Sequence, residues 1–388
     1  MNTVLFDDDL RENLLPLTFT RPVAELRVGI LTIAEKWGKR LNATLSYKTE
    51  AYLSAKYPER AADDTIFING ACLPSEALVQ SIKSLEVNAS LLSENGRLIA
   101  KRAARFDDES ENETKTQATF INYPEDIFSL NGEEIEADYD IVTVNRNSQE
   151  LSSTNMLLGK GRIFVEEGAK VEGAILNISN GSIYIGRNAE VMEGAIVRGG
   201  LALCDSASLK LGAKVYGPTT IGPHSKIGGE VNNCVIIGYT NKGHDGFLGN
   251  SVIGEWCNLG ADTNNSNLKN NYADVKIWSY TEKRFRNTNK QFCGLIMGDH
   301  SKCGINTMFN TGTVVGVSAN IFGSGFPRNY VPSFAWGGAA GYMTYQLKKA
   351  GETAALVYER RSKSFDKVEA GILKHIFNQT KSNRFWEK

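Results

Sequence analysis

The sequence lacks a long apolar run and carries almost no net charge. No stretch approaches the roughly 18 consecutive apolar residues of a membrane-spanning helix. The N-terminus also lacks the basic and apolar segments of a signal peptide. These absences predict a cytoplasmic protein that contacts no membrane. Its 43 lysines and arginines balance 44 aspartates and glutamates without a polybasic run, so nothing favours nucleic acid as a partner.

The six cysteines form no C-x-x-C motif. Cysteine metal sites and redox centres generally use such close pairs, and small secreted domains use disulfide frameworks. Several of the cysteines also fall within or beside a regular apolar repeat. We therefore expect reduced, mostly buried thiols.

The strongest pattern in the chain is a run of eight aliphatic residues that stand six positions apart. They are Ile185, Val191, Val197, Leu203, Leu209, Val215, Ile221 and Ile227. A period of six fits neither an α-helix nor an amphipathic strand, but it is typical of a hexapeptide solenoid. Three hexads complete one triangular coil, and the aliphatic of each hexad points inward. The spacing of six recurs in two further series. The first is Phe247, Ile253 and Leu259, and the second is Met297, Cys303, Phe309, Val315 and Ile321.

Residues 1–148 lack this period and alternate between strand and helix patterns. The expected elements are strands at 4–6 and 65–68 and helices at 30–41 and 76–85. Alternating strands and helices predict a layered α/β domain.

The solenoid domain is expected over residues 149–345. An insertion between about 264 and 292 breaks the period and should leave the prism as a loop, where binding groups commonly lie. Residues 346–388 form a C-terminal tail. Within it, helical spacing predicts one amphipathic helix that carries Phe365, Val368, Ile372 and Ile376.

The segment at 244–263, His-Asp-Gly-Phe-Leu-Gly-Asn-Ser-Val-Ile-Gly-Glu-Trp-Cys-Asn-Leu-Gly-Ala-Asp-Thr, resembles a known family. It is similar to the acetyltransferase half of the bifunctional uridyltransferase/acetyltransferase that makes UDP-N-acetylglucosamine. The resemblance implies a left-handed parallel β-helix, a homotrimer, and acetyl-CoA bound between neighbouring prisms. It places the general base on His244 and two asparagines of the sugar and acetyl-CoA site on Asn258 and Asn267. Lys242 is a nearby candidate for a basic substrate-binding residue, and Phe247 replaces a tyrosine of the family.

A histidine suits the implied chemistry because its pKa lies near neutrality. It can take a proton from an amino sugar as the nitrogen attacks a thioester. The structural alternative is that asparagines form ladders between successive coils. Likewise, His224 and His300 recur at one hexad position and are expected to be ordinary exposed corner residues.

The segment at 14–22, Leu-Leu-Pro-Leu-Thr-Phe-Thr-Arg-Pro, resembles the start of sugar-1-phosphate nucleotidyltransferases. This resemblance implies a Rossmann-like nucleotidyltransferase fold. The family's glycine-rich turn is replaced here by residues 7–13, which contain three aspartates and no glycine. Val23 stands where the family has lysine, and Asn69-Gly70-Ala71 replaces its metal-binding Gly-Asp.

Two interpretations of this domain remain open. In one, Arg11, Arg21 and Arg27 hold the phosphates of a sugar phosphate or nucleoside triphosphate, and Asp7 and Asp9 hold Mg²⁺. In the other, the domain keeps the fold and has lost the reaction, and the aspartates form a solvated turn.

The leading prediction is a transferase of sugar-nucleotide metabolism. The solenoid would transfer an acyl group, from acetyl-CoA, to an amino sugar phosphate or nucleotide. One alternative is an active nucleotidyltransferase whose solenoid serves only trimerisation. Another is a non-catalytic subunit that binds a sugar nucleotide.

Overall fold

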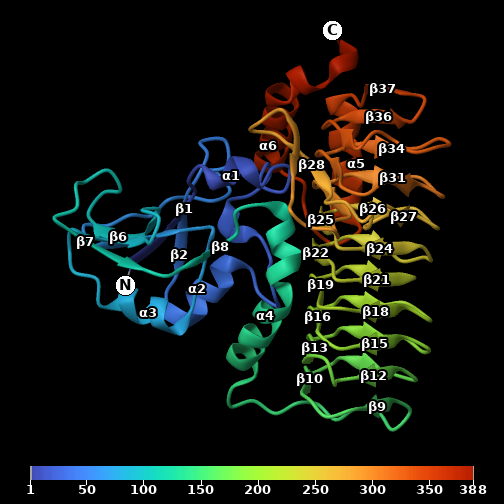
Figure 1. Ribbon diagram of the computed structural model, residues 1–388, viewed down its shortest axis with the longest axis horizontal. Helices are drawn as coiled ribbons and strands as arrows, with labels where there is room; N and C mark the ends of the chain where they lie inside the picture. The colour runs from blue at the N-terminus through green and yellow to red at the C-terminus, as the bar shows by residue number, and fades with distance from the viewer. Residues whose placement is uncertain (1, 388) are drawn as a thin grey trace. The chain divides into compact units, whose positions relative to one another are not determined.

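The computed structural model describes residues 2–387, which form two compact units (Figure 1). The N-terminal unit comprises residues up to 14, 20–26 and 31–123, and the solenoid unit comprises 15–19, 27–30 and 124 onward. No helix in the described part of the chain combines the length and apolar character needed to cross a membrane.

A six-stranded mixed sheet forms the centre of the N-terminal unit, in the order β2-β1-β3-β6-β5-β7. Its strands are β1 (Asn2–Phe6), β2 (Leu45–Lys48), β3 (Thr65–Asn69), β5 (Ala89–Ser93), β6 (Leu98–Ala103) and β7 (Asn112–Thr116). β1 runs parallel to β2 and β3, whereas β6 is antiparallel to β3 and β5. A short pair, β4 (Cys72–Leu73) and β8 (Thr119–Phe120), lies outside this sheet. The predicted α/β domain and both predicted strands are confirmed.

The helices of this unit are α1 (Leu10–Asn13), η1 (Val23–Glu25), α2 (Ile33–Leu41) and α3 (Glu76–Lys83). Both predicted helices are present, but α2 begins three residues later than expected. The Thr32 hydroxyl accepts from the Glu35 N–H, and the Glu35 carboxylate accepts from the Thr32 N–H. This reciprocal capping box fixes the start of the helix after Thr32.

Three parallel sheets form the faces of the solenoid. The first contains β10 (Ile163–Val165), β13 (Ile183–Ile185), β16 (Leu201–Leu203), β19 (Thr219–Ile221), β22 (Val235–Gly238), β25 (Val252–Glu255), β30 (Leu295–Met297), β33 (Thr313–Val315) and β35 (Tyr330–Val331). The second contains β11 (Lys170–Val171), β14 (Glu190–Val191), β17 (Ser208–Leu209), β20 (Lys226–Ile227), β23 (Asn241–Lys242), β26 (Asn258–Leu259), β31 (Lys302–Cys303), β34 (Asn320–Ile321) and β36 (Ala335–Gly338), with β37 (Gly341–Thr344) antiparallel at its end. The third contains β9 (Met156–Leu158), β12 (Ile175–Asn177), β15 (Ile196–Arg198), β18 (Lys214–Tyr216), β21 (Glu230–Asn232) and β24 (Phe247–Gly249), and β27 (Asn264–Asn265) pairs with β32 (Met308–Phe309).

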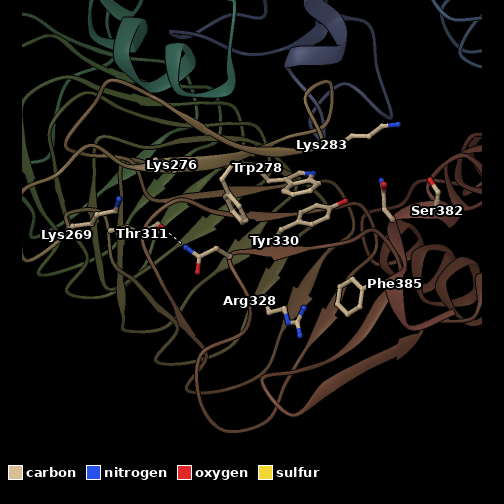
Figure 2. A pocket seen from close by; sticks show the side chains of 12 residues that line it. Lys269, Lys276, Trp278, Lys283, Thr311, Arg328, Tyr330, Ser382 and Phe385 are labelled. Carbon is tan, nitrogen blue, oxygen red and sulfur yellow. Dashed lines mark hydrogen bonds between the residues drawn. The ribbon is translucent and has the colours of Figure 1, made fainter. Parts of the chain in front are cut away.

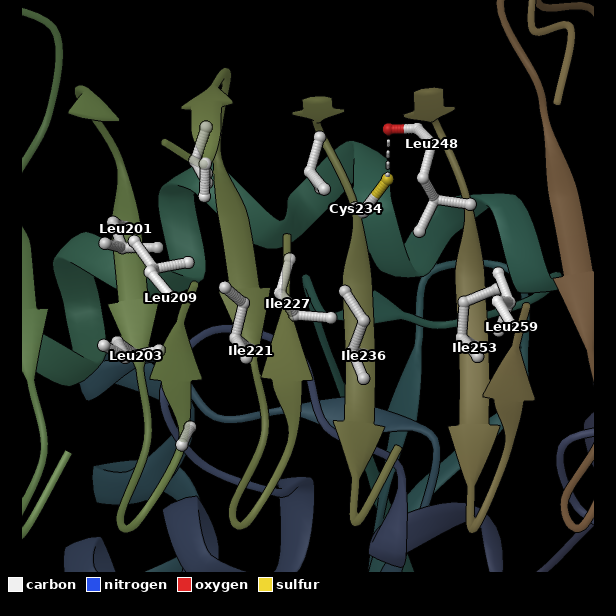
Figure 3. Packing of buried hydrophobic residues seen from close by; sticks show 14 of the residues in the cluster. Leu201, Leu203, Leu209, Ile221, Ile227, Cys234, Ile236, Leu248, Ile253 and Leu259 are labelled. Atoms are coloured by element: carbon white, nitrogen blue, oxygen red, sulfur yellow. Dashed lines mark hydrogen bonds between the residues drawn. The ribbon is translucent and has the colours of Figure 1, made fainter. Parts of the chain in front are cut away.

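The interior of the solenoid is the predicted apolar stack (Figure 3). All eight residues of the unbroken series are at most 2% exposed, and the series from Met297 to Ile321 is buried as well. Phe247 is an exception, because Leu248 takes the inward position opposite Val231. The corner between Leu248 and Ile253 is one residue shorter than a regular hexad, which shifts the register. All six cysteines are unpaired and buried, as predicted.

The insertion, expected to leave the prism as a loop, contains a β-hairpin. Its strands are β28 (Lys276–Ser279) and β29 (Arg284–Asn287). Trp278 stacks on Tyr330 with 4.3 Å between ring centroids, so the hairpin is attached to a solenoid coil. The Arg286 guanidinium also forms a buried 2.7 Å ion pair with Glu125 on α4 (Pro124–Thr143).

The C-terminal tail contains two helices, not one. They are α5 (Leu347–Glu359) and α6 (Lys367–Gln379), followed by η2 (Lys381–Asn383) and η3 (Phe385–Glu387). The chain breaks before α6 because Asp366 accepts from the N–H groups of Val368 and Glu369 as an N-cap. Tyr358 of α5 stacks on Trp256 at 4.0 Å and lies 6.0 Å from the His300 ring. His300 is therefore buried, and the expectation of an exposed corner residue was wrong for it.

Candidate functional site

His244 lies in a solenoid corner between β23 and β24, and its side chain is exposed. The corner closes at Gly246, whose φ of +117° suits glycine. A Cβ on Gly246 would lie 2.2 Å from the Thr263 carbonyl oxygen of the next coil. The corner is therefore packed tightly on its neighbour while the imidazole faces outward.

Lys242 supports this corner from inside the prism. It pairs with Ile227 in the register of β20 and β23, so it occupies an interior position that other coils fill with an aliphatic residue. Its ammonium donates to the carbonyls of Gly228 and His244, both at 2.9 Å. Burial lowers the pKa of Lys242 to about 8. The predicted substrate ligand is thus placed where it holds the backbone of His244.

Asn258 and Asn267 belong to two separate asparagine pairs. The Asn258 side-chain oxygen accepts from the Asn241 amide at 3.0 Å, and these residues are opposite each other in β26 and β23. The Asn267 amide donates to the Asn250 side-chain oxygen at 2.7 Å. Both arrangements are ladders between successive coils. Each of the two residues is half-buried.

Within residues 2–387, the only hydrogen bond among these four predicted residues runs from the Lys242 ammonium to the His244 carbonyl. No hydrogen bond joins the His244 ring to either asparagine in that range. The imidazole of His244 is therefore exposed on a corner whose backbone is held by the Lys242 ammonium. A substrate would have to approach this imidazole from outside the prism.

In the N-terminal unit, Asp7 directly follows β1, and its side chain is only 7% exposed. Its carboxylate accepts from the Val23 N–H at 2.9 Å and the Thr49 hydroxyl at 2.5 Å, and lies 3.5 Å from the Arg11 guanidinium. Burial raises the pKa of Asp7 to about 6, against the lowering effect of these partners. Asp7 therefore organises the turn that takes the place of a glycine-rich loop.

Arg97 binds the other two aspartates of the turn. It contacts the carboxylates of both Asp8 and Asp9, the latter at 2.6 Å, and it lowers the pKa of Asp9. Asp8 also accepts from the Asn69 amide at 2.8 Å. No local motif marked Arg97 in the sequence, because its partners are far away in the chain, and Asn69 stood out only as part of the replacement for the family's metal-binding Gly-Asp.

The carboxylates at 7–9 do not fit a magnesium site in this arrangement. Each already faces a protein donor or cation, which competes with a metal ion for its lone pairs. Residues 2–387 contain no group of three or more histidine, cysteine or acidic side chains placed to hold a metal ion. The predicted Mg²⁺ role of Asp7 and Asp9 stays a prediction without support from the geometry.

The three predicted phosphate-binding arginines are all buried. Arg11 donates to the Tyr52 hydroxyl at 2.7 Å and, like Arg21, belongs to the N-terminal unit. Arg27 donates to the Ile30 carbonyl and belongs to the solenoid unit.

A cavity of about 710 Å³ in the N-terminal unit has a polar lining. Its lining includes Arg97 and none of the three predicted arginines. Hydroxyl and amide groups supply much of the rest, from Ser75, Ser93, Asn95, Gln117, Thr119 and Asn122. Such groups can hydrogen-bond sugar hydroxyls, so this cavity is the candidate sugar-binding region of the unit.

The chain is similar in sequence to several known proteins. Residues 3–147 match the family model described as sugar nucleotidyl transferase. The bifunctional protein GlmU of Methanocaldococcus jannaschii is 38% identical over 87 residues, which are 22% of this chain and 21% of that protein. A bifunctional sugar-1-phosphate nucleotidylyltransferase/acetyltransferase of Sulfurisphaera tokodaii is 28% identical over 186 residues, or 47% and 43% of the two chains. GlmU of Methanococcus aeolicus is 30% identical over 87 residues, or 22% and 20%.

The fold and the family match define a sugar nucleotidyltransferase-like α/β unit joined to a parallel β-solenoid. This confirms the architecture and the family resemblance predicted from the sequence, and it supports the prediction of a transferase. The relatives are named as bifunctional proteins. The matched part of this chain spans less than half the length of each of them.

Proposed function

We propose that the solenoid transfers an acetyl group from acetyl-CoA to the amino group of a sugar phosphate or sugar nucleotide, with His244 as general base. The observation that carries this proposal is the exposed His244 imidazole on a corner braced by a buried lysine. The relatives include a protein named as an acetyltransferase, and this favours the same reaction.

The proposed chemistry uses the neutral imidazole. The nitrogen of the sugar amino group attacks the thioester carbonyl, and His244 accepts a proton from this amino group as the new bond forms. A backbone N–H of a neighbouring corner can stabilise the oxyanion that forms. The C–S bond then breaks, the amide remains on the sugar, and the thiolate leaves to be protonated. Asn258 and Asn267, both half-buried, would orient the sugar hydroxyls or the donor.

Thiol release from acetyl-CoA tests this proposal directly. The wild type would be assayed with a panel of amino-sugar phosphates and nucleotides, beside His244→Ala and a control, His375→Ala, which changes an exposed histidine on α6. We expect turnover to fall at least about a hundredfold in His244→Ala, the low end for losing a general base, and to persist in His375→Ala. Turnover within a few-fold of wild type in His244→Ala would refute the assigned role.

Nucleotidyl transfer is the second candidate function, favoured by the family match over residues 3–147. In this case Arg11, Arg21 and Arg27 would contribute to phosphate binding, and the solenoid would serve homotrimer assembly. The assay is pyrophosphate release from nucleoside triphosphates and sugar phosphates, with and without Mg²⁺. Pyrophosphate release by the wild type that is lost in Arg21→Ala would favour nucleotidyl transfer. If the wild type releases no pyrophosphate with a broad substrate panel, this function is excluded.

A non-catalytic sugar-nucleotide-binding subunit would behave differently in both assays. It would show a ligand-dependent rise in the melting temperature without turnover, because a ligand that binds only the folded state stabilises it. Acetyl transfer at an ordinary enzymatic rate would exclude this alternative.

A further inference from the structure

The solenoid unit contains a cleft of about 900 Å³ that none of the predicted site residues lines (Figure 2). The inserted hairpin forms one wall through Lys276, Trp278 and Phe285. A coil contributes Arg328 and Tyr330, and the C-terminal η2 and η3 turns contribute a further wall that includes Phe385. Three segments far apart in the sequence therefore converge on this space.

Positive charge dominates the lining. Lys269, Lys276, Lys283 and Arg328 all line the cleft, and none of the described residues around it is acidic. Within residues 2–387, none of these four side chains forms an ion pair within 4.0 Å, although the Lys269 ammonium donates to the Asp274 carbonyl at 2.7 Å. Cations gathered on one concave surface attract a complementary anion and raise its local concentration.

Aromatic rings accompany this charge. Trp278 lies flat on Tyr330, with an interplanar angle of 10°, and Phe285 meets Trp278 edge-on at 5.5 Å. Phe285 is 43% exposed and Phe385 is 39% exposed, and the Arg328 guanidinium lies 4.9 Å from the Phe385 ring. Exposed rings beside cations are a platform on which a planar base can stack while its phosphates meet the charges.

We propose that this cleft binds the nucleoside diphosphate part of a ligand. Inorganic anions would satisfy the lysines and Arg328 but would leave the rings unused, whereas an uncharged aromatic ligand would leave the cations unused. A nucleoside diphosphate uses both. Two ligand classes carry this group, coenzyme A through its adenosine diphosphate portion and sugar nucleotides through their nucleoside diphosphate. The proposal is independent of acetyl transfer at His244, because it concerns binding and not turnover.

Calorimetric titration of the full-length protein tests the proposed chemistry. ADP and UDP should each bind saturably, and more tightly than pyrophosphate or adenosine alone. Coenzyme A and a UDP-hexose are titrated in separate arms, and the tighter binder identifies the source of the group. Affinity should fall as salt rises, because cations supply much of the attraction. Absence of saturable binding for ADP, UDP, coenzyme A and the UDP-hexose would overturn the proposal.

Three variants test whether the nucleotide binds in this cleft. Lys276→Ala and Arg328→Ala each remove one exposed cation, and Phe285→Ala removes an exposed ring without opening the apolar core. Each should weaken ADP or UDP binding about tenfold, as expected for one charged contact or one stacked base. Lys214→Ala, on an exposed strand position of an earlier coil, is the matched control and should bind as the wild type does. Equal affinity of all four variants and the wild type would place the ligand elsewhere and refute this site.

Discussion

Lys242 makes the stability of the solenoid depend on pH in a predictable direction. Its ammonium lies in the interior register between aliphatic positions, and burial lowers its pKa from 10.5 to about 8. Between these two values the unfolded chain holds the proton and the folded chain does not, so folding becomes more favourable as pH rises. At 1.36 kcal/mol for each pKa unit, the contribution of Lys242 should rise by about 2–3 kcal/mol between pH 7 and pH 10.

Lys242→Met isolates this contribution, because methionine fills similar space and does not titrate. Urea unfolding of wild type and variant would be compared at pH 7 and pH 10, with Lys226→Met on the exposed part of β20 as control. The stability of the wild type relative to Lys242→Met should increase by about 2–3 kcal/mol over this range, and the control should show no such change. If the difference in unfolding free energy between wild type and Lys242→Met stays constant with pH, the ammonium is not desolvated in the folded protein. This result would refute the reasoning.

Three further perturbations test the packing and the ion pairs. Ile221→Ala should lower the free energy of unfolding by about 2–5 kcal/mol because it opens a cavity in the prism. The control Leu211→Ala, at a 67% exposed position, should change this free energy by less than about 0.5 kcal/mol. Similar losses for the two variants in urea unfolding would contradict this prediction. Glu125→Gln removes the carboxylate charge that faces the Arg286 guanidinium at 2.7 Å, and it should cost about 3–5 kcal/mol, as expected for breaking a largely buried ion pair. Arg286→Met in the same chain should recover part of the loss. Additive losses would argue against a coupled pair. Burial raises the pKa of Asp7 to about 6, so its contribution to stability is fully present below pH 3.8 and is lost as pH rises through 6. Relative to Asp7→Asn, the wild type should lose about 2.4 kcal/mol between pH 4 and pH 7. A difference in unfolding free energy that stays flat with pH would exclude a perturbed Asp7.

The solenoid could be predicted because one buried residue per hexad determines it. The spacing of six continues only while each coil keeps 18 residues, as between Leu203 and Ile221. The next coil places Ile236 opposite Ile221, and the one after places Ile253 opposite Ile236, so the coils shorten to 15 and 17 residues. The inward position of Leu248 could not be read from the period, since it depends on where a corner loses a residue.

Contacts between distant parts of the chain were beyond prediction from local pattern. Arg97 meets Asp8 and Asp9 across about ninety positions, and Arg286 meets Glu125 across 161. Neither Arg97 nor Arg286 belongs to a recognisable motif, and each pair forms only because of how the elements pack. The covering of His300 by Tyr358 has the same cause, because the helix that buries the ring follows it by more than fifty residues.

Both places where we propose ligand contact coincide with departures from the regular repeat. The His244 corner lies where a lysine replaces the interior aliphatic residue, at the cost of a buried charge. The basic aromatic cleft is built by the hairpin that interrupts the coil after β27. A regular hexad needs only its inward residue and a compact corner, so the repeat itself requires neither an interior lysine nor a projecting hairpin. Such departures mark positions where the chain serves a requirement other than folding, and projecting segments on a rigid scaffold are where binding groups are commonly found.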